Sequence, residues 1–105
     1  MDDVIFMYVT IASKAEGQKI ARVLVEEQLI ACANIYEGVH SVYRWQGKVC
    51  TEDEAVMILK TKASAYDQTA KRVRELHSYT VPCIVKLPIV GGDAEYLSWL
   101  RSCLL

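Results

Sequence analysis

The stretch that decides the fold is VHSVYRWQGKV, residues 39–49, in which alternating residues lead into a turn. Alternation of this kind places successive side chains on opposite faces of a β-strand. Gln46-Gly47-Lys48 is typical of a hairpin turn, because glycine tolerates the positive φ that tight hairpins require. A second extended run, 49–62, returns from the turn. Each arm is therefore about 14 residues long, well beyond the usual strand of about 5–6 residues.

The end of the second arm, AVMIL (55–59), is apolar on both of its faces. A sheet that is covered on both sides explains such a pattern. Because a domain this small covers one face with its own helices, we expect the other face to meet another subunit. Val56 and Ile58 would lie in that interface. Tyr43 and Trp45, near the hairpin tip, would act as its aromatic anchors.

The segments on either side of the hairpin complete a familiar order of elements. VIFMYVTI (4–11) is rich in β-branched and aromatic residues and predicts a strand. The remaining predictions are a helix over 14–29 with a Ser13–Glu16 capping box, a helix from Ser64 with Asp67 at its capping-box position, a strand over 83–90 and a helix over 94–105. The order β-α-β-β-α-β defines an α+β, ferredoxin-like sandwich with a long central hairpin and an extra C-terminal helix.

Composition restricts the class of protein. The chain has 105 residues, which fits a single domain spanning 1–105. Hydrophobic residues make up 52% and charged residues 24%, which excludes a disordered chain or a membrane span. The formal net charge is −1 with scattered Lys and Arg, so we expect neither nucleic acid nor a membrane as partner. The sequence begins without the positive segment of a signal peptide, which predicts a cytoplasmic protein.

The stretch ELHSYTVPCIV (75–85) raises the question of a metal site or a nucleophile. Copper and zinc accept imidazole and thiolate ligands, which His77 and Cys83 provide. Three interpretations of His77 remain open: a structural residue at the helix C-terminus, a weak transition-metal ligand, or part of a small-ligand cleft. Cys83 as a nucleophile would need a lowered pKa and an adjacent base. We expect a structural junction in which Pro82 follows the end of the helix, His77 lies at the accessible edge and Cys83 points inward.

The remaining polar residues give weaker signals. None of the four cysteines forms a CxxC pair, so we expect them to be small buried hydrophobes. The acidic run 52–54 is typical of a solvated strand edge, although carboxylates also bind hard cations. His40 is predicted to lie opposite the region of Glu54. Lys60 lies in an otherwise apolar strand and needs a partner or a cleft. Lys60, His77 and Tyr79 are the candidates for an inter-subunit ligand cleft.

Several stretches together resemble the CutA divalent-cation tolerance proteins, and the match covers nearly the whole chain. The resemblance implies a ferredoxin-like homotrimer whose long hairpins reach neighbouring subunits, with links to copper tolerance and divalent-metal binding. The PII signalling proteins share this trimeric plan, but a shared fold does not by itself carry a function across. The stretches are ACANI (31–35), SVYRWQGKV (41–49), MILKT (57–61), ELHSYTVP (75–82), LPI (87–89) and DAEYLSWL (93–100).

The sequence departs from the family at the proposed metal ligands. The usual pattern His-Pro-Tyr-x-x-Pro-Glu is changed here, with Ser78 in place of a proline and Cys83 in place of an acid. The family's other proposed copper ligands, a cysteine and a second histidine, correspond to Val9 and Leu76. Of the proposed ligands, His77 alone carries over.

These observations predict a trimeric, non-enzymatic protein of divalent-cation response, with weak Cu(II)-type binding and no organic cofactor. One alternative is a PII-like trimer that senses a small ligand or a partner protein. The other is an enzyme that depends on Cys83 and His77.

Overall fold

The computed structural model describes residues 3–105, so the first two residues of the predicted domain 1–105 lie outside the described part. Its elements follow the predicted order β-α-β-β-α-β with one further helix. They are β1 (Val4–Ile11), α1 (Lys14–Glu26), β2 (Cys32–Trp45), β3 (Lys48–Lys62), α2 (Tyr66–Leu76), β4 (Ile84–Pro88) and α3 (Ala94–Ser102). The four strands form one sheet in the order β2-β3-β1-β4, with every neighbouring pair antiparallel. The predicted α+β, ferredoxin-like fold is therefore confirmed.

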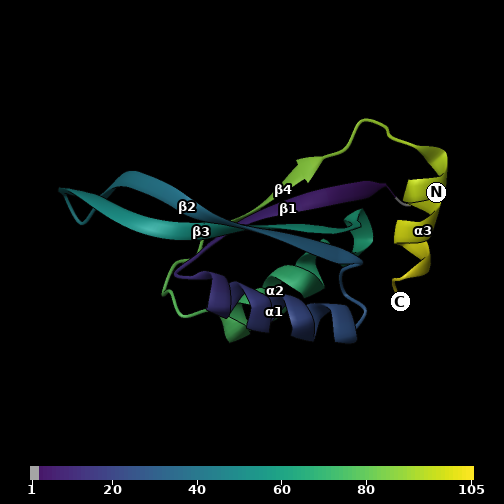
Figure 1. The fold of residues 1–105 in the computed structure, drawn as a ribbon, viewed down its shortest axis with the longest axis horizontal. Helices are drawn as coiled ribbons and strands as arrows, with labels where there is room; N and C mark the ends of the chain where they lie inside the picture. The colour runs from purple at the N-terminus through teal and green to yellow at the C-terminus, as the bar shows by residue number, and fades with distance from the viewer. Residues whose placement is uncertain (1–2) are drawn as a thin grey trace.

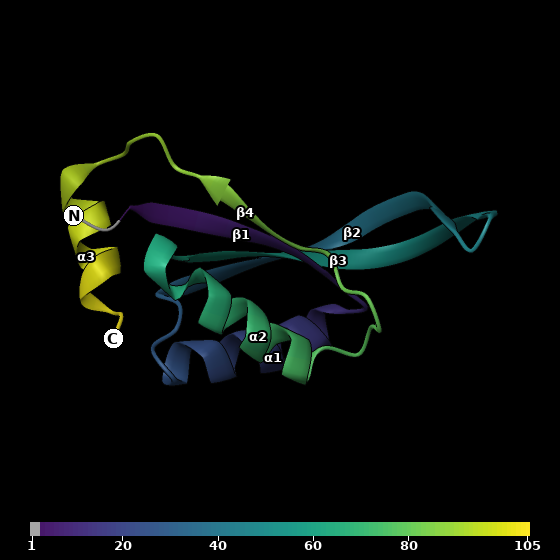
Figure 2. The same cartoon turned by 180° about the vertical axis from the view of Figure 1, so that it is seen from behind.

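One face of the sheet is covered by α1 and α2 (Figures 1 and 2). Met7, Val9 and Ile11 of β1 are fully buried on this face, whereas the alternating residues Tyr8 and Thr10 are only partly buried. This alternation is the period of two that a strand imposes. The core continues into both helices through Ile20, Ala21, Leu24, Ala70 and Val73.

The opposite face carries several apolar side chains and is not covered by α1 or α2. Register partners on neighbouring strands share a face, and Tyr8 of β1 pairs with Ile58 of β3 and with Val85 of β4. Tyr36 of β2 pairs with Val56 of β3 on the same face. Tyr36 is 56% exposed and Val85 is 45% exposed. We call this surface the open face.

The β2–β3 hairpin projects away from the helices and gives the molecule a long axis of 45 Å (Figure 1). Its arms have 14 and 15 residues, as the sequence predicts. The turn has positive φ at Gln46 (51°) and Gly47 (81°), the geometry that tight hairpins require. A register shift between Tyr36 and Val39, with Gly38 at φ 78°, marks a bulge that bends the arm.

Several predicted boundaries are wrong in detail. α1 ends at Glu26 rather than 29, because Gln28 adopts a φ of 59° that no right-handed helix continues through. α2 begins at Tyr66 after one 3₁₀ turn over Ala63–Ala65, so its N-cap residue is Ala65 rather than Ser64. β4 and α3 are shorter than predicted, at 5 and 9 residues.

Candidate functional site

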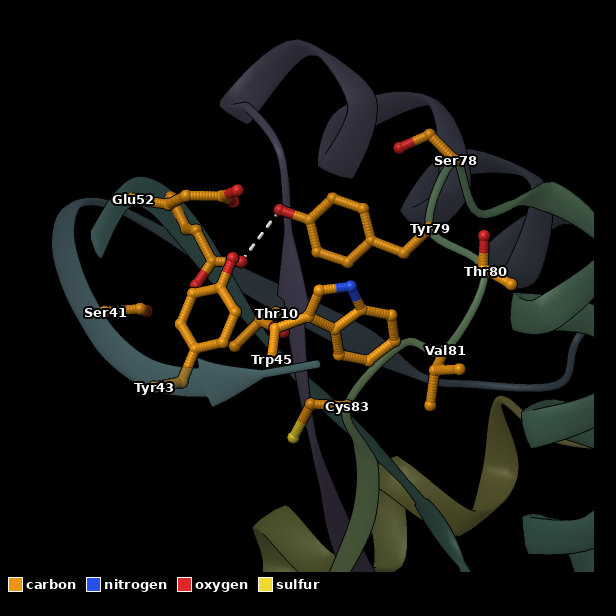
Figure 3. Close-up of a pocket in the computed structure, with 11 residues that line it drawn as sticks. Thr10, Ser41, Tyr43, Trp45, Glu52, Ser78, Tyr79, Thr80, Val81 and Cys83 are labelled. Atoms are coloured by element: carbon orange, nitrogen blue, oxygen red, sulfur yellow. Dashed lines mark hydrogen bonds between the residues drawn. The ribbon is translucent and has the colours of Figure 1, made fainter. Parts of the chain in front are cut away.

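A pocket of about 590 Å³ lies between the hairpin and the 78–83 connection from α2 to β4 (Figure 3). The strand period explains its lining, because alternate residues of β2 face the same side as Glu52 and Glu54 of β3. The end of β1 closes the base, and the connection forms the opposite wall. The lining residues are Thr10, Ser41, Tyr43, Trp45, Glu52, Glu54, Ser78, Tyr79, Thr80, Val81 and Cys83.

His77 fixes the turn that forms one wall of this pocket. Its Nε2 lies 2.7 Å from the backbone oxygen of Thr10, and the backbone N–H of Tyr79 donates to its Nδ1 at 3.0 Å. A carbonyl only accepts and an amide N–H only donates, so the ring is the neutral Nε2–H tautomer. Both ring nitrogens of His77 are therefore engaged with the backbone.

Glu16 holds the same turn from the side of α1. Its carboxylate accepts hydrogen bonds from the backbone N–H of Ser78 at 2.9 Å and of Ala12 at 3.1 Å. Burial disfavours the charged carboxylate, but the hydrogen bonds from Ser78 and Ala12 outweigh it, so the pKa of Glu16 lies below its usual value. The Ser13 hydroxyl accepts from the Glu16 N–H at 3.2 Å, which confirms half of the predicted capping box.

Two tyrosine–glutamate pairs lie in the pocket. The Tyr79 hydroxyl donates to Glu54 Oε1 at 2.7 Å (Figure 3). Burial first, and then this bond, raises the pKa of Tyr79. The hydrogen bond to Glu52 is the main cause that raises the pKa of Tyr43 to about 12. Both phenols therefore remain protonated donors at neutral pH, and both carboxylates are held on the pocket side of β3.

The pair of Tyr43 and Glu52 predicts a change in the pKa of Tyr43 when Glu52 is replaced. In Glu52→Gln, we expect the pKa of Tyr43 to fall from about 12 toward the ordinary 10.0, because the charged acceptor that favours the neutral phenol is gone. A pKa raised in the folded state contributes stability that is present below pH 10 and is lost as the pH rises through about 12. NMR of the Tyr43 ring across this range measures the shift.

Asp53→Asn is the matched control for this titration. It removes one charge from the same strand, but Asp53 lies on the other face of β3, in contact with His40. An equal fall of the Tyr43 pKa in Asp53→Asn would contradict the assigned pair.

The structure places Lys60 away from the other two candidates for the ligand cleft. Its Nζ bonds the Tyr96 hydroxyl at 3.1 Å and lies 5.5 Å from the ring centroids of Phe6 and Tyr96. The hydrogen bond that Lys60 donates to Tyr96 is the main cause that raises the pKa of Lys60. Lys60 pairs in register with Phe6, whereas His77 contacts Thr10, four residues further along β1. Within one chain, the structure brings His77 and Tyr79 together, but not Lys60.

The predictions about the cysteines need correction. Cys83 is exposed rather than turned inward, because β4 begins one residue later and Cys83 still belongs to the pocket wall. The other cysteines are only partly buried, so none of the four is the buried hydrophobe that was predicted. His40 lies opposite Asp53, which is in the predicted region of Glu54, and Glu54 itself is opposite Val39 beside the bulge.

The predicted interface residues differ in exposure. In this chain Tyr43 is 37% and Trp45 47% exposed. Val56 is 4% exposed, and Ile58 is partly buried. Tyr43 and Trp45 both line the pocket, while Ile58 belongs to the open face.

The donor groups do not form a ready-made metal centre. Among residues 3–105, no group of three or more His, Cys, Asp or Glu side chains is arranged to hold a metal ion. The nitrogens of His77 are both hydrogen-bonded, so the site does not fit a tightly held resident metal. In the same range of residues, no helix is long and apolar enough to cross a membrane.

The fold and the pocket together define a small ferredoxin-like protein that carries its candidate site at the base of a long hairpin. Comparison with known proteins identifies it further. The chain belongs to the CutA1 divalent ion tolerance protein family, whose sequence model matches residues 5–103. The resemblance found in the sequence is thus confirmed.

Relatives of this family are similar to this chain along nearly all of its length. The divalent-cation tolerance protein CutA of Thermus thermophilus is 46% identical over 102 residues, which is 97% of each chain. The chloroplastic CutA 1 of Oryza sativa is 43% identical over 93% of this chain, which spans 55% of that relative. The solved structure of CutA1 from Thermus thermophilus has a TM-score of 0.93 at 44% identity, covering 96% of this chain and 98% of that one. The CutA1 structure from Oryza sativa has a TM-score of 0.96 at 40% identity, covering 99% and 95%.

Proposed function

We propose that this protein acts in the cytoplasm as a homotrimer in the response to divalent cations, without catalysing a reaction. Family membership supports the link to divalent cations. The observation that carries the assembly is the open face, where Tyr36 and Val85 are 56% and 45% exposed. The helices α1 and α2 lie on the other side of the sheet (Figure 2). Contiguous apolar surface of this kind is typical of protein–protein contacts. The number of subunits, three, is what the CutA resemblance implies.

Residues of the hairpin and the open face support this assembly. Val42 and Val49 of the hairpin are 69% and 66% exposed, and Leu87 of β4 is 41% exposed. Tyr43 and Trp45 supply the aromatic anchors that interfaces favour. An arm that reaches beyond its own core gains packing only when another chain covers it.

Weak Cu(II) binding at His77 is part of this proposal. A metal ion would have to displace the Tyr79 N–H from Nδ1, or the Nε2 proton together with its bond to Thr10. Losing a satisfied hydrogen bond costs about 1 kcal/mol or more, which reduces the affinity. The same engagement argues against catalysis, because His77 has no free nitrogen to act as a base for the Cys83 thiol.

A Cu(II) titration tests the metal part of the proposal. We expect a weak, saturable signal in the wild-type protein and none in His77→Ala, followed by calorimetry. His40→Ala is the control, because it removes the second histidine of the chain from an exposed position. Retention of the signal in His77→Ala together with its loss in His40→Ala would move the site to the hairpin.

A further inference from the structure

The charges that line the pocket all have one sign. Glu52 and Glu54 contribute carboxylates, and among residues 3–105 no Lys, Arg or His side chain lines the pocket. Asp53, between them in sequence, is directed to the other face, so the two pocket carboxylates lie two residues apart on one side of β3. Alternate residues of a strand are about 6.6 Å apart along its axis. The pocket therefore favours a cation, and offers two acceptors for it.

Aromatic rings form much of the rest of the wall. Tyr43 and Trp45 face the pocket from β2, and Tyr79 faces it from the opposite connection (Figure 3). A cation over such faces is attracted by the ring quadrupole, most strongly by that of tryptophan. The volume, about 590 Å³, lies in the range of small-molecule sites and is far more than a bare metal ion needs.

The carboxylates have bonding capacity left. An ionised carboxylate accepts about four hydrogen bonds. The Tyr79 hydroxyl uses one position on Glu54, and Tyr43 uses one on Glu52. These phenols fix the direction of the carboxylates and leave other lone pairs for a donor in the pocket. An ammonium group supplies up to three N–H donors, which suits such acceptors.

We propose that this pocket binds a small organic ammonium ion, and that a short aliphatic diamine fits it best. One ammonium group would contact Glu52 and the other Glu54, with the methylene chain against Trp45 and Tyr43. A hard metal ion is the poorer occupant, because Ca²⁺ takes 6–8 oxygen ligands and Mg²⁺ needs an octahedron. The proposal goes beyond the response to divalent cations and does not depend on His77 binding copper.

In the proposed trimer, a second copy of the chain is another source of an ammonium group for this pocket. Tyr43 and Trp45 are also the expected interface anchors, so the pocket would lie at a subunit boundary. A lysine side chain from a second copy would satisfy the carboxylates in the same way as a free amine. The experiment must therefore use the assembled protein and ask whether the pocket is open to a free ligand.

Calorimetric titration with 1,4-diaminobutane tests the proposal, with 1,4-butanediol as the neutral ligand of similar length. We expect saturable binding of the diamine, weaker at high salt, and no binding of the diol. Glu52→Gln and Glu54→Gln should each weaken binding about tenfold or more, because a charge-assisted hydrogen bond becomes a neutral one. Glutamine keeps an acceptor for each phenol, which limits structural change. Asp53→Asn, on the other face of the same strand, should leave the affinity within about twofold, because an exposed charge there is screened.

A second measurement uses the wild-type protein alone, so its result does not depend on whether the variants fold. In the wild-type protein, the diamine should shift the NMR signal of the Trp45 indole N–H, and the diol should not. Absence of both heat and shift at millimolar diamine would overturn the proposal and favour a lysine of another subunit as the occupant. Equal weakening in Asp53→Asn and Glu52→Gln would also overturn it, because binding would then reflect the general charge of the hairpin.

Discussion

Light scattering is expected to give three chains per particle for the wild-type protein at low micromolar concentration, and one chain for Ile58→Glu. Ile58 pairs in register with Tyr8 on one side and Asn34 on the other, in the middle of the open face. In the proposed trimer, a carboxylate at this position would be buried without a partner. The desolvation penalty of such a charge is several kcal/mol per ion, and it would be repeated in every subunit.

The matched control introduces the same charge elsewhere. Gln18 lies on the exposed side of α1, away from the open face, so Gln18→Glu should leave the mass unchanged. Circular dichroism of both variants shows whether the fold persists. A wild-type protein that scatters as a monomer would contradict the proposed trimer. An Ile58→Glu protein that keeps the wild-type mass would contradict the placement of the subunit interface on the open face.

Most of the fold could be predicted from the sequence, because strands and turns depend on residues that are close together in the chain. The β-branched and aromatic run 4–11 and the apolar run 55–59 predict buried strands, and the structure buries Met7, Val9 and Met57 completely. The turn at 46–48 was predictable because only a residue such as Gly47 adopts its positive φ without strain. The end of α1 was not, since the left-handed residue there is Gln28, a residue type that gives no such signal.

The candidate site was predicted only in part, because its contacts join distant parts of the chain. His77 contacts Thr10, 67 residues away, and Tyr79 contacts Glu54, 25 residues away. No local pattern encodes such distances. Glu52 and Glu54 were interpreted as a solvated edge, yet their alternation with Asp53 was the available signal that they share a face with Ser41. For Cys83, the apolar strand that follows suggested burial, whereas its position one residue before β4 leaves it in the pocket wall.

The turn at 77–79 connects the proposed copper ligand, His77, with the pocket proposed to bind an amine. His77 binds β1, Ser78 binds Glu16 of α1, and Tyr79 binds Glu54 of β3. Three consecutive residues thus tie the pocket wall to three different elements. A metal ion that takes a nitrogen of His77 would loosen this wall, so metal binding and amine binding would oppose each other through the turn.

The second large effect is expected in α1, the helix that packs on the core. One buried and one exposed residue, next to each other in this helix, make the test specific. Leu24 of α1 is 0% exposed within the core cluster, while Val25 beside it is 43% exposed. Leu24→Ala is expected to lower the free energy of unfolding by about 2–5 kcal/mol, because it removes buried methyl groups and leaves a cavity. Val25→Ala should change it by no more than about 0.5 kcal/mol, because the lost contacts are few and alanine favours the helix.

Urea unfolding followed by circular dichroism measures both values. All proteins must be compared at one chain concentration, because assembly contributes to the apparent stability of an oligomer by mass action. The slopes with urea should agree between the variants, since each folded state buries nearly the same surface. Similar losses in Leu24→Ala and Val25→Ala would mean that α1 does not present a single face to the sheet. The assignment of the sheet face that α1 covers would then be wrong, and so would the assignment of the open face.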